Sequence, residues 1–243
     1  IVQSRFFNPT EPRDSIYLSQ SDESEVVQNV DLMQQALSLF GNMCDFLSEK
    51  KIDKLCYLFD INRKYVDENV DAYWLDTELI DKLNDKLLHA DLIKLTNGSF
   101  TAIVDIWDNA QVYFPHNTKK EIRKGLWKLY YSINPESLPQ IQDVEDWYKF
   151  SFNDFPKLNF ERMFSFLGQN EAADDLVETL NAESIKDVIS WLNCFLDIAF
   201  KDGDAWRSIK ENEYAVLLNQ KKQLAYWAKL KEDRIENGIL KDI

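Results

Sequence analysis

DESEVVQNVDLMQQALSLFGNMCDFL, residues 22–47, is the stretch that decides the fold. Its apolar residues recur at alternating spacings of four and three, which places them on one face of an α-helix. They are Val26, Val30, Met33, Leu37, Phe40, Cys44 and Leu47. A two-stranded coiled coil would show the same pattern, but the repeat is short, so we expect core packing. Asp22, with Glu25 three residues later, predicts a capping box at the start of this helix.

Similar apolar repeats predict further helices along the rest of the chain. We expect them near residues 52–59, 75–89, 118–134, 141–150, 159–168, 171–181 and 185–200. Thr118 and Glu121 have the spacing of a capping box, and Asn159 and Asn170 stand where N-cap residues are expected.

Two segments change to a period of two residues, which indicates β-hairpins. The first, residues 92–104, has Asn97-Gly98 at its turn, where we expect both central residues to need positive φ. The second, residues 214–226, has its turn near residues 219–222.

Together these elements predict a mainly α (α+β) fold, made of helical bundle units that are each followed by a short β-hairpin. We expect residues 21–110 to form one helical unit with the Asn-Gly hairpin. Residues 111–243 are expected to form a second helical unit that ends in a hairpin. Before them, residues 1–20 are expected to contain a short strand, a proline turn and a second strand at Ser15–Leu18.

Composition and charge limit the classes of partner. Hydrophobic residues make up 45% of the chain, which is too apolar for a disordered protein. The net charge is 28 − 42 = −14, so the surface repels phosphate, and we expect neither nucleic acid nor a membrane as a partner. The three cysteines form no Cys-x-x-Cys pair and suit a reducing compartment, so we expect a cytoplasmic protein.

Residues with catalytic chemistry are few. His89 and His116 lack partners at metal-ligand spacing, and we expect both to be structural. Asp202-Gly203-Asp204 could hold phosphate or Mg²⁺, but a solvent turn between helices is the favoured interpretation. No nucleophile elbow, P-loop or dinucleotide-binding glycine pattern occurs, so no catalytic, cofactor-binding or metal-binding residue is predicted in this chain. We expect most of the seven tryptophans in helix packing, with one or two left for an exposed binding surface.

Residues 6–14, Phe-Phe-Asn-Pro-Thr-Glu-Pro-Arg-Asp, are dense in charged and conformationally restricted side chains. One interpretation is a structural turn in which Arg13 contacts Glu11 or Asp14. The other is that Arg13 is presented to a partner domain or to a phosphate.

Several segments together resemble a known family. Residues 7–18, Phe-Asn-Pro-Thr-Glu-Pro-Arg-Asp-Ser-Ile-Tyr-Leu, resemble a segment that follows the nucleotide-binding domain of large sacsin-like proteins. Those proteins carry a GHKL-type ATPase domain related to the ninety-kilodalton heat-shock chaperones. Further similar segments are residues 87–90, 97–98, 126–135, 218–220 and 239–243. The last two resemble the family's Pro-Asn-Gln-Asn-Gly hairpin and its Leu-Lys-Asp-Ile close.

The chain departs from the family in the second hairpin. Leu218 replaces the usual proline, and Lys221-Lys222 replace the residues that would include the turn glycine. The type of this turn therefore stays open.

The resemblance implies that residues 1–20 are the tail of a preceding ATPase module. That module would supply a Mg²⁺-binding Asn and an Asp-x-Gly-x-Gly loop, and neither motif occurs in these 243 residues. ATP and Mg²⁺ are therefore expected in the upstream domain and not in this chain. The start at Ile1, without an initiator Met, also suggests a fragment. By analogy with split GHKL ATPases, Arg13 could sense a γ-phosphate held by that domain.

We therefore expect a non-catalytic fragment of a large sacsin-like GHKL-type ATP-binding protein, which couples the upstream ATPase domain to clients or partners. The alternative is an autonomous helical protein-interaction scaffold with an exposed Trp/Phe surface. An independent hydrolase is the least supported interpretation, because no nucleophile, base or metal set emerges. The client, the oligomeric state and the pathway, proteostasis or phage defence, stay open.

Overall fold

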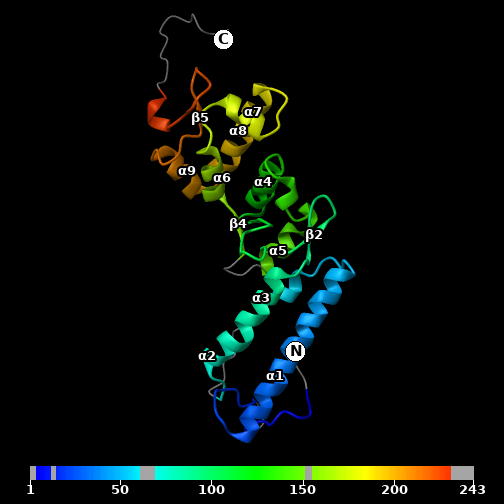
Figure 1. Cartoon of the computed structure of the whole chain (residues 1–243). Coiled ribbons are helices and arrows are strands. Elements are labelled where there is room, and N and C mark those ends of the chain that lie inside the picture. The colour runs from blue at the N-terminus through cyan, green and yellow to red at the C-terminus, as the bar shows by residue number, and fades with distance from the viewer. Residues whose placement is uncertain (1–3, 12–14, 61–68, 151–154, 231–243) are drawn as a thin grey trace, which may run out of the picture. The chain divides into compact units, whose positions relative to one another are not determined.

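The chain forms two compact units (Figure 1). The computed structural model describes residues 4–11, 15–60, 69–150 and 155–230. Unit 1 comprises residues 1–114 and 136–156, and unit 2 comprises residues 115–135 and 157–243. The sequence analysis divided the chain in order, at residues 110 and 111. In the structure, residues 136–156 also belong to unit 1, because buried side chains of this segment complete the core of that unit.

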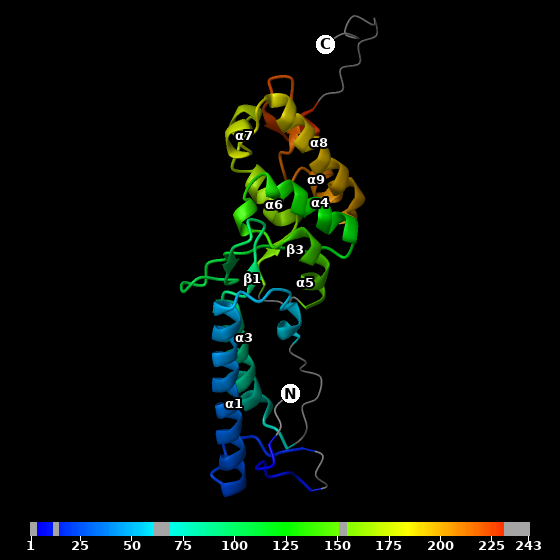
Figure 2. The same cartoon turned by 90° about the vertical axis from the view of Figure 1, so that its right-hand side faces the viewer.

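Unit 1 begins with helices and continues into a hairpin. Its elements are α1 (Ser24–Glu49), η1 (Cys56–Phe59), α2 (Ala72–Trp74), η2 (Leu75–Ile80), α3 (Asp81–His89), β1 (Ile93–Lys94), β2 (Phe100–Thr101), η4 (Ile141–Asp143) and α5 (Val144–Phe150). Helices α1 and α3 lie side by side (Figures 1 and 2). Two elements lie where the chain passes between units, β3 (Phe114–Pro115) and η3 (Pro135–Ser137).

Unit 2 has the same order of helices and then a hairpin. Its elements are α4 (Lys120–Tyr131), β4 (Lys157–Leu158), α6 (Phe160–Leu167), α7 (Ala173–Thr179), α8 (Ile185–Lys201), α9 (Gly203–Lys210), β5 (Leu217–Leu218), β6 (Leu224–Ala225) and η5 (Trp227–Lys229). The strands form the two-stranded pairs β1–β2, β3–β4 and β5–β6. The predicted mainly α fold, with small strand pairs after helical units, is therefore confirmed.

The helix predicted at residues 75–89 begins earlier than its apolar repeat. The carboxylate of Asp71 caps α2 by accepting a hydrogen bond from the backbone N–H of Trp74, 3.1 Å away. The side chain of Trp74 is buried, so the extra turn adds to the core. Residues 75–80 then follow a π-helical path into α3. The helix predicted at 52–59 is reduced to the single turn η1.

Two predicted capping boxes are wrong. The N-cap residue of α1 is Glu23 and not Asp22, and no side chain makes a capping bond there. The N-cap residue of α4 is Lys119, again without a side-chain cap from Thr118. Instead, the backbone N–H of Lys119 donates to the side-chain oxygen of Asn117 at 2.9 Å. The predictions failed because several neighbouring polar residues could each cap the same helix.

The two predicted asparagine caps have different outcomes. The side chain of Asn159 accepts a hydrogen bond from the N–H of Arg162 at 3.1 Å, so its role as the N-cap of α6 is confirmed. Asn170 does not cap α7, and its side-chain oxygen accepts from the hydroxyl of Thr179. The start of α7 is held by the carboxylate of Asp175, which accepts from the two backbone N–H groups that precede the helix, at 2.9 Å each.

Both predicted hairpins are present as antiparallel pairs. Ile93 lies opposite Thr101 and Lys94 opposite Phe100 in the first, and Leu217 lies opposite Ala225 and Leu218 opposite Leu224 in the second. The expected turn type of the first hairpin is wrong, because Gly98 has a positive φ of 84° and Asn97 does not. The turn is a three-residue loop, which needs a left-handed residue at its last position alone.

Residues 136–156 belong to unit 1 because their aromatic side chains fill its core. The ring of Trp147, on α5, packs edge-on against Phe59 with centroids 5.3 Å apart. Phe155 meets the ring of Phe59 at 5.3 Å and that of Phe114 at 4.8 Å. All four side chains are buried.

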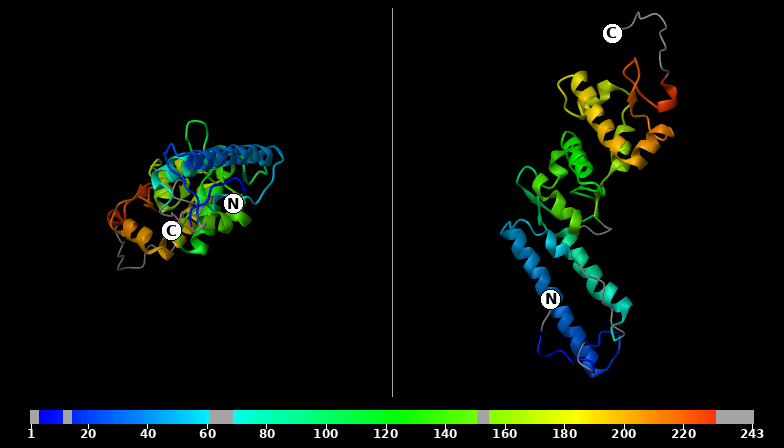
Figure 3. Two further views of the ribbon diagram at one scale, coloured as in Figure 1. Left: turned by 90° about the horizontal axis from the view of Figure 1, so that it is seen from below. Right: turned by 180° about the vertical axis from the view of Figure 1, so that it is seen from behind.

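Unit 2 packs around α8, which is shown from behind in Figure 3. The indole N–H of Trp191 donates to the carbonyl oxygen of Leu129 at 3.1 Å, which ties α8 to α4. The two helices approach closely at Gly125, where an added Cβ would lie 2.7 Å from a methyl carbon of Ile198. The buried rings of Phe164 and Phe195 join α6 to the same helix, with centroids 5.7 Å apart.

The buried amide of Asn29 is one of the groups that attach the N-terminal segment to α1, and Gln28 also binds Phe6 and Asn8. The side-chain oxygen of Asn29 accepts from the N–H of Asn8 at 2.7 Å, and its NH₂ group donates to the carbonyl oxygens of Asn8 and Tyr17. The strands expected within residues 1–20 are reduced to isolated bridges, between Pro9 and Ile16 and between Leu18 and Val70 in the described residues.

Among the described residues, no helix has both the length and the apolar character needed to cross a lipid bilayer.

Candidate functional site

Arg13, the phosphate-sensing candidate, lies outside the described residues, as does the 239–243 segment of the family resemblance. The first part of the Pro-Thr-Glu-Pro segment is described. There, the N–H of Thr10 donates to the carbonyl oxygen of Ser15 at 2.9 Å, and Thr10 is buried. This hydrogen bond and the bridge between Pro9 and Ile16 bring the two described sides of the segment together.

His89 ends α3, as the sequence analysis expected. Its Nδ1 lies 2.9 Å from the carbonyl oxygen of Asp85, and its Nε2 lies 3.4 Å from a carboxylate oxygen of Asp108. These contacts connect the end of the helix with the loop that follows β2, which is a structural arrangement.

His116 lies in unit 2, where its backbone N–H donates to the carbonyl oxygen of Leu158 at 2.9 Å. Burial lowers the pKa of its imidazole, and the nearby charges of Lys157 and Arg123 lower it further. A ring with a lowered pKa is neutral near pH 7. The backbone hydrogen bond and the neutral ring indicate a structural role for His116.

Asp202-Gly203-Asp204 begins α9, between two helices. The carboxylate of Asp202 accepts from the N–H groups of Asp204 and Ala205, at 3.2 and 3.0 Å, and from the side-chain amide of Asn117 at 2.8 Å. Burial acts to raise the pKa of Asp202, but these hydrogen bonds outweigh it and the net pKa is lowered. The segment is therefore a helix cap, which agrees with the expected turn.

Metal ligands do not gather in the described part of the chain, where no three His, Cys, Asp or Glu side chains could share an ion. Cys44 and Cys56 are buried, and burial is the main cause of the raised pKa of each thiol. Cys194 is exposed on α8. A thiol with a raised pKa is a poor nucleophile, so the two buried cysteines act as core residues.

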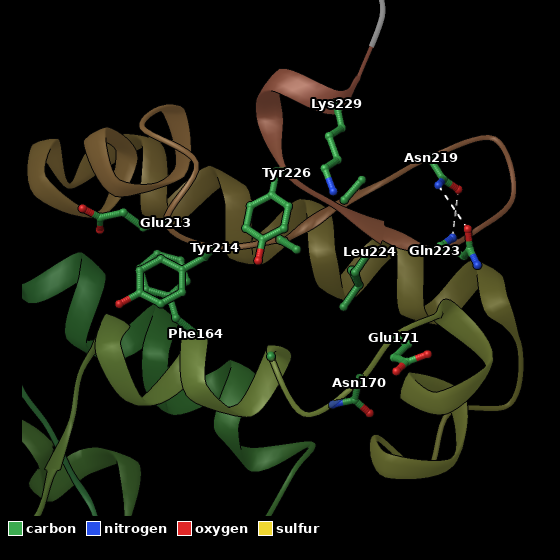
Figure 4. A pocket seen from close by; sticks show the side chains of 13 residues that line it. Phe164, Asn170, Glu171, Glu213, Tyr214, Asn219, Gln223, Leu224, Tyr226 and Lys229 are labelled. Carbon is green, nitrogen blue, oxygen red and sulfur yellow. Dashed lines mark hydrogen bonds between the residues drawn. The ribbon is translucent and has the colours of Figure 1, made fainter.

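Unit 2 contains a pocket of about 690 Å³ that is lined in part by polar side chains, and we name it the unit 2 pocket (Figure 4). Its lining comes from α6 and the segment before α7, from the segment before β5, and from the β5–β6 hairpin and η5. The lining residues are Phe164, Gly168, Asn170, Glu171, Glu213, Tyr214, Ala215, Asn219, Gln223, Leu224, Ala225, Tyr226 and Lys229. Sequence reasoning predicted the hairpin turn near Asn219 but no site there, because the lining residues are spread over 66 positions from 164 to 229.

Backbone hydrogen bonds hold the hairpin against the segment before α7. The N–H of Leu224 donates to the carbonyl oxygen of Glu171, and the N–H of Ala173 donates to that of Lys222, at 2.9 and 2.8 Å. An isolated bridge joins Ala172 with Gln223 between them. The segment 171–173 thus pairs with the β5–β6 hairpin through an isolated bridge and two backbone hydrogen bonds.

Aromatic rings form the apolar side of the pocket. The rings of Phe164 and Tyr214 are stacked, with centroids 4.1 Å apart and planes 8° from parallel (Figure 4). Phe164 is buried beneath Tyr214, which is half-buried. Above them, the ammonium group of Lys229 lies 5.4 Å from the ring centroid of Tyr226. Stacked rings of this kind offer a flat apolar surface to a ligand.

Polar side chains also line the pocket, and most of them are exposed or half-buried. The side-chain NH₂ group of Asn219 donates to the side-chain oxygen of Gln223 at 3.5 Å, and the backbone N–H of Gln223 donates to the side-chain oxygen of Asn219 at 3.0 Å (dashed lines in Figure 4). Glu171 and Glu213 add carboxylates, which accept hydrogen bonds, and Lys229 adds a donor. These groups can bind a polar ligand through hydrogen bonds. General acid–base catalysis needs a desolvated group beside an ionised one, and the exposed carboxylates here do not form such a pair.

Unit 1 has a second hollow, between α1 and the helical segment η2–α3. This groove of about 610 Å³ is lined by Met33, Ala36, Leu37, Leu39, Phe40, Met43, Leu58, Leu79, Leu83 and Leu87. Every one of these side chains is apolar. The groove can therefore bind apolar side chains and offers no polar group to a reaction.

Two tryptophans of the described chain are exposed, Trp107 and Trp227. Trp107 lies beside Ile106 in a loop after β2, and the two side chains are 77% and 81% exposed. The expected exposure of one or two tryptophans is confirmed, and their role as a binding surface stays a prediction.

Comparison of the chain with protein-family models, with curated proteins and with solved structures finds no match. The resemblance to sacsin-like ATPases therefore stays a prediction that rests on the residues quoted above.

Proposed function

We propose that this chain is a non-catalytic part of a large sacsin-like GHKL-type ATP-binding protein, and that it couples an upstream ATPase domain to clients or partners by binding them. ATP and Mg²⁺ would be held upstream. The cysteine pattern supports a cytoplasmic protein.

The observation that carries this proposal is that residues of the β5–β6 hairpin form part of the wall of the unit 2 pocket. Asn219 belongs to the segment that resembles the family's second hairpin, and its side chain lines the pocket opposite the stacked rings. A shift of this hairpin would move Asn219 and Gln223 relative to Phe164. Binding in the pocket and the position of the hairpin are therefore linked, which is what a coupling region requires.

The lining favours a peptide segment as the ligand. Side-chain amides and carboxylates can bind the N–H and C=O groups of an extended backbone, and the stacked rings can bind an apolar side chain. The pocket has the 300–1,000 Å³ size usual for binding sites. A client or a partner segment would supply such a peptide.

Calorimetry with Mg-ATP tests the assignment to a split ATPase. It compares the 243-residue chain with a version extended upstream through the preceding domain. We expect binding by the extended protein alone. Binding by the 243-residue chain would show that the assignment of the ATP site to the upstream domain is wrong. If neither protein binds, the ATPase relationship is wrong.

Arg13 provides a second test in the extended protein. If this arginine senses a γ-phosphate, Arg13→Ala should reduce ATP turnover while leaving nucleotide affinity less affected, because the contact acts on the transferred phosphate. Unchanged turnover would leave Arg13 as a turn residue.

An autonomous helical protein-interaction scaffold is the second candidate, and the exposed pair Ile106 and Trp107 favours it. The loop that carries them is closed by hydrogen bonds to the carboxylate of Asp105, from the N–H of Trp107 at 2.8 Å and the N–H of Asn109 at 2.9 Å. Rigid exposed aromatic side chains are typical anchors of protein interfaces. This candidate gains support if the 243-residue chain folds alone and the extended protein binds no nucleotide.

A further inference from the structure

Helix α1 carries a second apolar stripe beside the one that the sequence analysis identified. Its residues recur at spacings of four and three, and they are Leu32, Ala36, Leu39, Met43 and Phe46. Exposure is high along it, at 68% for Leu39, 37% for Met43 and 54% for Phe46. A surface helix normally needs one apolar stripe, so a second stripe indicates a second helical neighbour.

The first stripe already has its neighbour in the same chain. Met33, Leu37 and Phe40 line the groove together with Leu79 and Leu83 of the η2–α3 segment. The second stripe borders the open side of that groove, which Leu39 and Met43 also line. In the described part of unit 1, α1 and α3 form a pair without a third α-helix alongside (Figures 2 and 3). A pair of helices buries one side of each and leaves the other open.

Between Leu32 and Phe46 no charged residue lies on this open side of α1. Glu25 and Lys50 flank it at its two ends, where the ammonium group of Lys50 lies 5.7 Å from the ring centroid of Phe46. At about 100° per residue, Asp31, Asp45 and Glu49 lie roughly 100° to 140° around the helix from the centre of the second stripe. The groove lining contains no charged residue. An uncharged apolar face is complementary to a copy of itself, because self-pairing brings no like charges together.

We propose that α1 of a second copy of this chain covers the second stripe, in an antiparallel, two-fold symmetric contact centred on Leu39. The two α1–α3 pairs then form a four-helix arrangement of the kind that spacings of four and three favour. This inference stands independently of the proposed function.

The ends of α1 favour the antiparallel direction. With Leu39 on the symmetry axis, residue 28 of one copy faces residue 50 of the other. The acidic start of α1, with Glu23 and Glu25, therefore lies near Lys50 and Lys51 of the second copy. Antiparallel packing also places the opposite ends of the two helix dipoles together. A parallel contact would instead bring each acidic end against its own copy.

The size of the contact predicts a reversible dimer. Residues 32–46 span about 22 Å, and two helices side by side are about 20 Å wide. The contact then covers roughly 450 Å² on each copy, or about 900 Å² in total, which is below the range of stable interfaces. We expect the dimer to dissociate on dilution.

Sedimentation velocity over a range of concentrations tests the dimer. The expected result is a weight-average mass that rises with concentration toward twice the monomer mass. Leu39→Glu should hold the protein at the monomer mass, because two carboxylates would meet at the axis. Leu39 is exposed, so circular dichroism should show an unchanged fold. Val27→Glu is the matched control, since Val27 is exposed on another side of α1. It should leave the rise in mass unchanged.

Single cysteines test the direction of packing, in a Cys194→Ser background that removes the exposed thiol. Leu39→Cys should form a disulfide-linked dimer on mild oxidation, because the two positions meet. Phe46→Cys should not, because in the antiparallel contact its counterpart lies about 21 Å away along the helix. Equal cross-linking of both variants would overturn the antiparallel contact. A monomer at every concentration, or association that Leu39→Glu leaves intact, would overturn the second copy as the occupant.

Discussion

The turns of the two hairpins have the same backbone path but reach it with different residues. In the first, the N–H of Gly98 donates to the carbonyl oxygen of Leu95, and the N–H of Leu95 donates to that of Ser99. In the second, Lys222 donates to Asn219 and Asn219 to Gln223 in the same way. The left-handed position is Gly98 in one turn, with φ 84°, and Lys222 in the other, with φ 62°.

The second turn replaces the missing glycine with a side-chain bond. The side-chain oxygen of Asn219 accepts from the N–H groups of Lys221 and Gln223, at 2.8 and 3.0 Å. In the first turn, position 95 is a leucine and has no such acceptor. Glycine lowers the free energy of the left-handed residue itself, whereas asparagine stabilises the whole loop around a strained lysine.

A third loop supports this distinction. In residues 105–109, Asp105 binds the N–H groups two and four residues later, as Asn219 does, and Asp108 has φ 59°. An acceptor at the first position thus accompanies a left-handed residue other than glycine in both loops. The comparison leads to four predictions, in order of decreasing effect.

Asn219→Ala should destabilise unit 2 by about 2 kcal/mol, because two backbone hydrogen bonds are lost at about 1 kcal/mol each. Urea denaturation measures the change. Gln220→Ala, at the exposed next position, is the control and should change the free energy of unfolding by only a few tenths of a kcal/mol. If Asn219→Ala changes the free energy of unfolding as little as Gln220→Ala does, the side chain of Asn219 does not stabilise the loop.

Gly98→Ala should destabilise unit 1 by about 1 kcal/mol, because an L-residue is disfavoured in the left-handed region. An added Cβ at Gly98 has nothing within 4 Å, so the cost comes from the backbone alone. Lys222→Ala is the control in the second turn, where a residue with a Cβ already takes this conformation. An equal loss in both variants would contradict the proposed difference between the turns.

Lys222→Gly should stabilise unit 2 by about 0.5 kcal/mol. The relief of left-handed strain exceeds the larger conformational entropy of glycine in the unfolded chain. Thermal denaturation should show a higher midpoint. Lys221→Gly should lower it, since Lys221 does not have positive φ and gains nothing from the change.

Asp105→Asn should have the smallest effect at pH 7 and should remove an acid sensitivity. The hydrogen bond from the N–H of Asn109 is the main cause of the lowered pKa of Asp105. A carboxylate with a lowered folded pKa stabilises the loop above its unfolded pKa, near 3.8, and the contribution is lost as pH falls through the folded value. The protection factor of the Trp107 amide, which is its intrinsic exchange rate divided by its observed rate, should therefore fall in acid in the wild type and change less in Asp105→Asn.

The sequence was sufficient for features that depend on local periodicity. The spacing of apolar residues predicts α1 and α8, and the change to a period of two locates both hairpins, because periodicity needs no knowledge of the partner. The choice of cap could not be predicted at Asp22, Thr118 and Asn170. Neighbouring polar side chains compete for the same N–H groups, and the winner depends on how the chain enters the helix.

The sequence predicted the hairpin turn that carries Asn219, but it did not predict the candidate site. Phe164 and Tyr214 became part of a site only when α6 and the segment before β5 met. Their separation of 50 positions gives no local signal. Stacking between them is a property of the packed unit.

The sequence by itself therefore determined the helices, the hairpins and the mainly α class. The tertiary structure decided that residues 136–156 complete unit 1, through the burial of Trp147 and Phe155, and that the second stripe of α1 stays exposed. The physical reason is that the apolar pattern of a helix shows which face is apolar, but the burial of that face depends on which other segments pack against it. Such packing joins residues that are far apart in the sequence, and no short stretch of sequence predicts it.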